Sequence, residues 1–187
     1  MAPITFTTVS NEDEIRQILA LQSQNLAANI SAETLESQGF VTVRHTPEVL
    51  QAMNRARPSV LAKDGDRVVG YCLVMPRSFG SEIPELVSMF RMLDKLEWRG
   101  QPLRTQNWFV MGQVCVADGY RGQGVFDGLY RHLREVCSAD FNFVVTEISA
   151  RNLRSKAAHR RVGFETIHVF TDNSTGETWE VVVWDWS

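Results

Sequence analysis

Hydrophobic and polar residues follow regular periods along most of the chain, and these periods predict its elements. Residues 4–8 alternate and predict a first strand, and Ser10-Asn11-Glu12-Asp13 resembles a capping box that begins a helix. The apolar face of this helix has helical spacing and consists of Ile15, Ile18, Leu19 and Leu26. Thr46-Pro47 places a cap before a proline at the first helical position, which predicts a short helix to about Met53.

The middle of the chain contains a hairpin and then a long connection. Residues 60–63 and 68–75 read as strands on either side of Asp64-Gly65-Asp66, a turn sequence, and Pro76 ends the second strand. In the connection, residues 77–107, Pro84 begins a predicted helix, which Arg99-Gly100-Gln101-Pro102 breaks. The ridge of this helix is expected to be Leu86, Phe90, Leu93 and Glu97.

The second half of the chain alternates between strands and helices. Residues 108–116 are apolar on both faces, as in a central strand, and residues 141–149 form another strand. The helix between them is expected to bury Val125, Phe126, Leu129, Leu133 and Val136. Residues 166–171 and 178–186 form the last two predicted strands, joined by a turn.

A glycine-rich turn, Arg121-Gly122-Gln123-Gly124, joins the central strand to this helix. Glycine allows close approach of a ligand to the backbone, and the first N–H groups of a helix attract anions, so the turn predicts a phosphate site. The P-loop sequence is absent. A dinucleotide fingerprint fits poorly, because Gly128 comes one residue too late and the next strand ends in Ala150-Arg151-Asn152 without an acidic residue.

The same turn resembles the pyrophosphate-binding loop, Q/R-x-x-G-x-G/A, of the GNAT superfamily of acyl-CoA-dependent N-acetyltransferases. Phe126 departs from that pattern, since it stands where the family usually has glycine or alanine. A second stretch, from Asn152 through Ser155 and His159 to Gly163-Phe164, resembles the superfamily's N-x-x-[AS]-x-x-x-[YH]-x-x-x-G-F signature and also follows a strand. The resemblance covers about residues 108–164.

The resemblance implies an α/β fold: a central mixed, mostly antiparallel sheet of six or seven strands, splayed between the fourth and fifth strands, with helices on both faces. We expect residues 1–187 to form a single domain, with residues 77–107 as an inserted helical segment. The implied activity is transfer of an acetyl group from acetyl-CoA to a primary amine of a small-molecule or amino-acid-like acceptor, by direct attack in a ternary complex. A domain that binds an acyl-CoA as a sensor or scaffold, without turnover, is the alternative.

The resemblance also implies where the cofactor binds. The expected contacts are Val114, Cys115, Val116, Arg121, Gly122, Gln123, Gly124, Val125, Phe126, Asn152, Ser155 and His159. Asn152 also suits the N-cap of the following helix. His159 stands where many family members have a tyrosine near the cofactor sulfur, and imidazole could protonate a departing thiolate.

Glu147 is the candidate general base. If strand alternation holds, it shares a face with Phe143 and Val145, where burial would raise the pKa of its carboxyl group. Gln113 is a candidate for orienting the acceptor or a water. Cys115 is not expected to be a nucleophile, because no basic residue is adjacent to it.

Composition limits the remaining possibilities. The net charge is −3 without a basic stripe, so we expect no nucleic-acid partner, and no apolar run is long enough for a membrane span. Scattered Cys72, Cys115 and Cys137 suggest reduced thiols and a cytoplasmic protein, and no spacing suggests a metal site. Acidic residues in the inserted segment (Glu82, Glu85, Asp94 and Glu97) could attract a cationic amine. A monomer and a homodimer are both compatible with the sequence.

Overall fold

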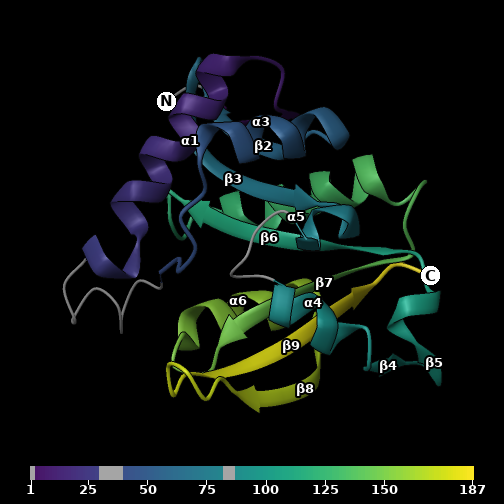
Figure 1. Cartoon of the computed structure of the whole chain (residues 1–187). Coiled ribbons are helices and arrows are strands. Elements are labelled where there is room, and N and C mark those ends of the chain that lie inside the picture. The colour runs from purple at the N-terminus through teal and green to yellow at the C-terminus, as the bar shows by residue number, and fades with distance from the viewer. Residues whose placement is uncertain (1–2, 30–39, 82–86) are drawn as a thin grey trace.

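The computed structural model describes residues 3–29, 40–81 and 87–187 (Figure 1). Seven strands form one sheet in the order β1-β2-β3-β6-β7-β9-β8. They are β1 (Thr5–Thr8), β2 (Val60–Asp64), β3 (Arg67–Met75), β6 (Trp108–Val116), β7 (Phe143–Ser149), β8 (Glu165–Thr171) and β9 (Thr178–Asp185). Neighbouring strands of this sheet are antiparallel except β6 and β7, which run parallel. The mixed, mostly antiparallel sheet that the sequence predicted is confirmed.

Helices cover both faces of the sheet, as predicted. They are α1 (Glu12–Asn25), α3 (Pro47–Ala56), α4 (Val87–Leu93), α5 (Val125–Cys137) and α6 (Leu153–Val162). In Figure 1, α1 and α3 lie on one side of β2 and β3 and α5 on the other, and α5 also contacts α6. Within the described residues, no helix has the length and apolar character needed to cross a membrane.

The two parallel strands separate part of the way along their length. Pairing between β6 and β7 runs only from Trp108 opposite Phe143 to Val110 opposite Val145. Beyond this point the hydroxyl group of Thr146 donates to the carbonyl of Met111 at 2.8 Å. Because β6 and β7 are the fourth and fifth strands of the sheet, the predicted splay is confirmed, and it opens a gap beside the last residues of β6.

The first helix begins one residue later than the capping-box interpretation placed it. Asn11 is its N-cap and accepts a hydrogen bond from the backbone N–H of Glu14, whereas Ser10 lies just outside the helix. Glu14 closes the box by accepting from both the backbone and the hydroxyl of Ser10, and it also pairs with Lys63 at 2.8 Å. This ion pair fixes the buried Glu14 carboxylate against β2.

The inserted segment is only partly helical. Helix α4 ends at Leu93, and the predicted ridge residue Glu97 instead begins a small hairpin, β4 (Glu97–Trp98) with β5 (Gln101–Pro102). The Trp98 indole donates a 2.6 Å hydrogen bond to Asp185, and this tertiary contact fixes the hairpin. The local sequence pattern could not predict it, because Asp185 lies far along the chain. Pro84, Leu86, Glu82 and Glu85 lie outside the described residues.

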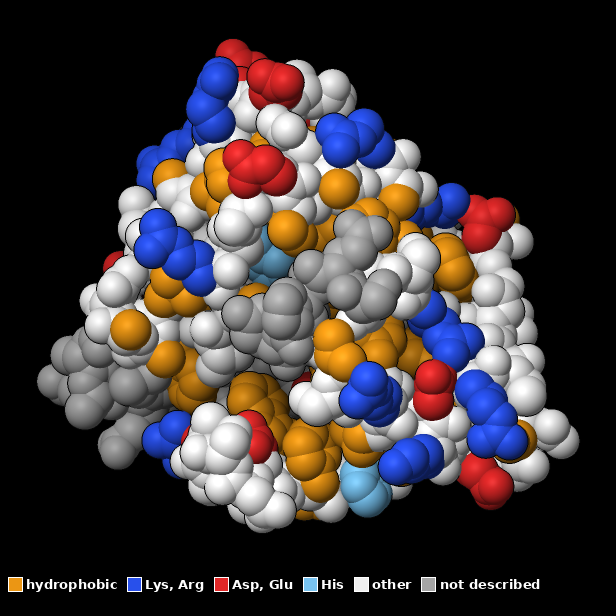
Figure 2. Space-filling view, viewed as in Figure 1, with side chains coloured by type: hydrophobic (Ala, Val, Ile, Leu, Met, Phe, Trp, Pro, Cys, Tyr) orange, Lys and Arg blue, Asp and Glu red, His pale blue; other side chains and the backbone are white. Residues whose placement is uncertain are grey.

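The same segment covers one end of the sheet. The Arg77 guanidinium lies 4.9 Å from the ring centre of Trp108 and pairs with Asp94, so one of the acidic residues expected to attract a cation already has a partner. The rings of Trp108 and Phe143 stack. Because Phe143 and Glu147 lie on the same face of β7, the inserted segment covers the face that also carries Glu147. On the face shown in Figure 2, basic side chains are interspersed with acidic ones and form no continuous stripe.

Candidate active site

The glycine-rich turn has the backbone of an anion cradle. Gly122 and Gly124 have φ angles of 74° and 77°, in the left-handed region that favours glycine. Gly124 is the N-cap of α5 and has no side chain to satisfy the first N–H groups of the helix. These donors therefore face outward at the positive end of the helix dipole, where a phosphate would bind.

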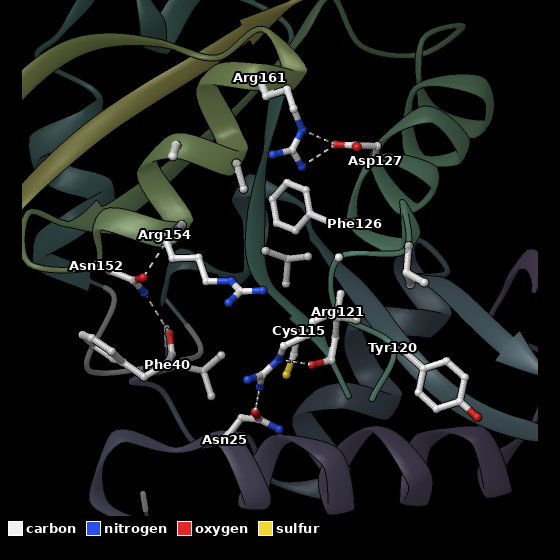
Figure 3. A pocket seen from close by; sticks show the side chains of 18 of the residues that line it. Asn25, Phe40, Cys115, Tyr120, Arg121, Phe126, Asp127, Asn152, Arg154 and Arg161 are labelled. Carbon is white, nitrogen blue, oxygen red and sulfur yellow. Dashed lines mark hydrogen bonds and ion pairs between the residues drawn. The ribbon is translucent and has the colours of Figure 1, made fainter. Parts of the chain in front are cut away.

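A cavity of about 510 Å³ opens in front of this turn, between the end of β6 and α6 (Figure 3). Ten of the twelve residues expected to contact the cofactor line this cavity: Val114, Cys115, Val116, Arg121, Gly122, Gly124, Val125, Phe126, Asn152 and Ser155. Gln123 does not, because its side chain folds back and donates to the carbonyl of Gly119. His159 lines only the second, smaller cavity.

Two basic residues of the cavity were not predicted. Arg154 and Arg161 lie on α6, and Figure 3 shows Arg154 reaching into the cavity opposite Arg121. Arg161 pairs with Asp127 of α5 at 2.9 Å. The helical pattern held a signal for them: Arg154, Ala157, Ala158 and Arg161 are spaced as one helix face, with small residues between two cations.

Phe126 does not close the phosphate loop. Its ring lies against the rings of Tyr130 and His159, with centroid distances of 5.0 and 5.2 Å. The side chain thus forms one wall of the cavity between α5 and α6 and leaves the cavity open. The departure from the family pattern changes the shape of this wall without removing the space in front of the glycines.

Asn152 serves as a helix cap and as a cavity wall at once. Its side-chain oxygen accepts from the backbone N–H of Ser155 at 3.2 Å, which makes it the N-cap of α6. Its amide nitrogen donates to the carbonyl of Phe40 at 3.3 Å. Since Asn152 and Ser155 line both cavities, they stand where the two cavities meet.

The second cavity, of about 80 Å³, adjoins the first and extends into the gap between β6 and β7. The two cavities share Phe40, Val41, Val114, Asn152 and Ser155. The three side chains singled out in the sequence for catalysis or acceptor binding, Gln113, Glu147 and His159, all line the smaller cavity. The structure therefore brings together residues that lie on β6, β7 and α6.

Glu147 has the properties of a poised base. It is partly buried, and one of its carboxylate oxygens, Oε1, is buried without a hydrogen-bond partner. Burial raises the pKa of the Glu147 carboxyl group to about 7, because the charged form loses hydration without gaining an ion pair. An acid–base group with a pKa near the working pH transfers protons most effectively.

His159 is buried and held on both sides of its ring. One ring nitrogen, Nδ1, lies 2.8 Å from the carbonyl of Ser155 and therefore carries the proton, while Nε2 accepts from the hydroxyl of Tyr130 at 2.6 Å. Burial lowers the pKa of His159 to about 4, so the ring is neutral near pH 7. This geometry gives no support to the expected role as proton donor, because the only ring proton is bound to a backbone carbonyl.

Gln113 and Cys115 line the two cavities, but both side chains are buried in the protein. The Gln113 carboxamide is buried and hydrogen-bonded through both its oxygen and its nitrogen. Burial raises the pKa of the Cys115 thiol to about 12, which keeps it protonated and unreactive, in keeping with the sequence interpretation. No cluster of three or more potential metal ligands occurs among residues 3–29, 40–81 and 87–187.

The larger cavity fits a long molecule with phosphates at one end. Uncapped N–H groups follow Gly124, and three arginines line the same cavity. The backbone of Val114 to Val116, which β7 leaves unpaired, leads from there toward the smaller cavity. The carboxylate of Asp127 would oppose an anion there, but Arg161 pairs with it. The donor groups and the apolar walls thus suit a phosphorylated, thioester-bearing cofactor such as acetyl-CoA.

Comparison with known proteins agrees with this geometry. Residues 30–164 match the profile of the acetyltransferase (GNAT) family. Among curated proteins, no sequence is significantly similar to the chain.

Solved acetyltransferases share the fold. The Escherichia coli ribosomal-protein-S18-alanine N-acetyltransferase superimposes with a TM-score of 0.64 at 10% identity, covering 99% of this chain and 95% of that one. The protein yncA of Salmonella typhimurium, solved with acetyl-CoA as its cofactor, gives 0.65 at 13% identity, with 100% and 95% covered. The NatC complex bound to Gag peptide and CoA gives 0.66 at 13% identity, with 98% and 99% covered.

Proposed function

The chain belongs to the acetyltransferase (GNAT) family, and we propose that it moves the acetyl group of acetyl-CoA to the nitrogen of a primary amine. The amine attacks directly while donor and acceptor are both bound. The observation that carries this proposal is the position of Glu147. Its unpartnered carboxylate, with a pKa near 7, lines the small cavity that adjoins the phosphate-binding one.

Acetyl-CoA, when bound, supplies an acyl group activated as a thioester. We assign its phosphates to the N–H groups that follow Gly124, with Arg121 and Arg154 nearby. The pantetheine arm would follow the backbone of Val114 to Val116, which β7 leaves unpaired after Val110. Preorganised N–H groups of this kind stabilise negative charge on a carbonyl oxygen without reorganisation.

Glu147 supplies the proton transfer that the amine requires. An alkylamine has a pKa of roughly 10 and reaches the enzyme as an ammonium ion. The carboxylate form of Glu147 takes one proton, directly or through a water, and the free nitrogen then forms the C–N bond as the C–S bond breaks. The attacking nitrogen gives up a second proton as it becomes an amide, and the departing CoA thiolate takes up this proton to leave as the free thiol. We assign His159 a positioning role, since it links Ser155, which lines both cavities, to the buried hydroxyl of Tyr130.

The acceptor end favours a small or slender amine. The cavity beside Glu147 holds about 80 Å³, enough for an amino group and a few carbons, and Trp179 forms one side of it. Small polyamines, amino-acid-like amines and the amino terminus of a peptide would all fit such an opening. One structural neighbour is named as an N-acetyltransferase of a ribosomal protein, and another was solved with a peptide bound. We place the enzyme in the cytoplasm, where its three free, buried cysteines would stay reduced.

An acceptor screen tests the proposal. Purified protein and acetyl-CoA are mixed with spermidine, lysine or tetra-alanine, and free thiol release is followed with mass spectrometry of the amine. Amine-dependent thiol release with an acetylated product would support transfer. Tight acetyl-CoA binding without any amine-dependent release would instead favour a non-catalytic acyl-CoA sensor.

A further inference from the structure

The two cavities share a wall formed by a segment that belongs to neither helix nor strand. Residues Phe40 to His45, called the strap below, directly precede Thr46, the N-cap of α3. Phe40 and Val41 line both cavities, and Thr42 and Val43 line the smaller one. The position of the strap therefore sets the width of the opening beside Glu147.

Polar contacts from three different elements hold the strap. At its first residues, Asn152 donates to the carbonyl of Phe40, and Val41 pairs through both backbone groups with the end of α1, at 3.0 Å each. At its other end, the backbone N–H of His45 donates to the side-chain oxygen of Gln22 at 2.9 Å. Between them, Gln113 of β6 donates from Nε2 to the carbonyl of Val43 at 2.9 Å.

The orientation of the Gln113 carboxamide is fixed from behind. Its oxygen accepts from the hydroxyl of Tyr71 at 2.6 Å and from the side-chain nitrogen of Gln22 at 2.7 Å. A flipped amide would face the Gln22 donor with its own donor and the Val43 carbonyl with its own oxygen, losing both contacts. The two buried donors thus direct the nitrogen of Gln113 toward the strap.

From these contacts we infer that Gln113 is a positioning residue for the acceptor, which holds Val43 and with it the strap at the wall of the smaller cavity. It acts on the acceptor through the backbone of the strap, in place of the direct contact expected from the sequence. The inference rests on the proposed function in one respect, namely that the smaller cavity receives the amine. The attachment of Gln113 to the strap itself does not depend on that function.

Two variants of the same buried network separate this role from a general effect on the core. Gln113→Met keeps the length of the side chain but removes its bond to Val43 together with its bonds to Tyr71 and Gln22. Tyr71→Phe removes a different bond to the same Gln113 oxygen and leaves the bonds to Val43 and Gln22 in place. Acceptor KM, kcat and the acetyl-CoA dissociation constant are measured for both, with the best acceptor from the screen above, together with hydrogen–deuterium exchange of peptides covering residues 40–45.

Gln113→Met should raise the acceptor KM about three- to tenfold, the effect of losing one ordinary hydrogen bond, and should speed exchange in the strap. Its kcat and acetyl-CoA affinity should stay within about twofold of the wild type, as should all values for Tyr71→Phe. The inference is overturned if Gln113→Met leaves the acceptor KM and strap exchange unchanged. It is also overturned if Tyr71→Phe changes the acceptor KM and strap exchange as much as Gln113→Met does.

Two further outcomes remain decisive. If Gln113→Met does not fold, Gln22→Met removes the bond to His45 at the end of the strap and is expected to give the same rise in acceptor KM and in exchange. If the wild type acetylates no amine, the proposed function fails. Strap exchange then still decides the attachment: faster exchange in Gln113→Met alone supports it, and equal exchange rejects it.

Discussion

The Glu147→Gln substitution should make the protein more stable at alkaline pH while removing its proposed base. In the folded protein, burial moves the pKa of this carboxyl group from 4.5 to about 7. Folding therefore favours the protonated form, and the wild type loses stability as the pH rises from about 4.5 through about 7. Above pH 7 the full cost of the buried carboxylate is present.

The magnitude follows from these two values. A difference of one pH unit in pKa corresponds to about 1.4 kcal/mol, so a change from 4.5 to about 7 amounts to about 3 kcal/mol. Glutamine is uncharged at every pH and nearly the same shape. We expect the variant to exceed the wild type by up to about 3 kcal/mol in unfolding free energy at pH 8.5, and to differ little at pH 4.5.

Urea denaturation of both proteins at pH 4.5, 6, 7 and 8.5 measures this difference directly. Glu165→Gln is the matched control, because Glu165 lies exposed on β8 of the same sheet. Its stability should follow the wild type at each pH. A Glu147→Gln variant that is no more stable than the wild type at pH 8.5 would refute the reasoning that Glu147 is a buried, unpaired carboxylate.

Three further predictions concern the donor cavity and the buried histidine. Gly124→Ala should cost about 1 kcal/mol of stability through its positive φ and should also weaken acetyl-CoA binding measured by calorimetry. The control Gly176→Ala, at a φ of 70° in the β8–β9 turn, should cost stability alone. Equal acetyl-CoA affinities for the two variants would argue against the anion cradle. Arg154→Ala should weaken acetyl-CoA binding, and more so at low salt, while the control Arg160→Ala on the outer face of α6 should not. A larger loss of affinity in Arg160→Ala than in Arg154→Ala would place the phosphates elsewhere. Burial lowers the pKa of His159 from 6.5 to about 4, so the contribution of the neutral ring to stability is complete above pH 6.5 and is lost as the pH falls toward 4. In denaturant titrations, His159→Gln should therefore lose less unfolding free energy than the wild type between pH 7.5 and 5. A variant with the same pH dependence as the wild type would contradict the assignment.

Local signals in the sequence were sufficient to predict the glycine-rich turn. The positive φ angles of Gly122 and Gly124 and the uncapped start of α5 depend on residues that are adjacent in the chain, so the glycine-rich turn could be recognised directly. The periods of β6 and β7 also placed Glu147 on a face with apolar neighbours. Its raised pKa follows from that position, because burial acts on the carboxyl group and no cation in the described part of the chain offsets it.

Contacts between distant segments could not be predicted in the same way. Gln113 was expected to touch the acceptor, but its partners Gln22 and Val43 are 91 and 70 residues away in sequence, and no periodicity reveals such pairs. The hairpin at Trp98 depends equally on a distant residue, Asp185, whose carboxylate overrides the local helical pattern. The protonation state of His159 likewise required knowledge of Tyr130 and of complete burial.

The rate of amine-dependent thiol release by the wild type and by Glu147→Gln, at saturating acetyl-CoA, tests the central claim most directly. Loss of a general base costs about a hundredfold or more in rate, while acetyl-CoA affinity, measured alongside, should not change. We predict a wild type that transfers acetyl to an amine and a variant slower by at least that factor. Equal rates in the two proteins would contradict the role of Glu147, and the absence of amine-dependent release by the wild type would contradict the transferase itself.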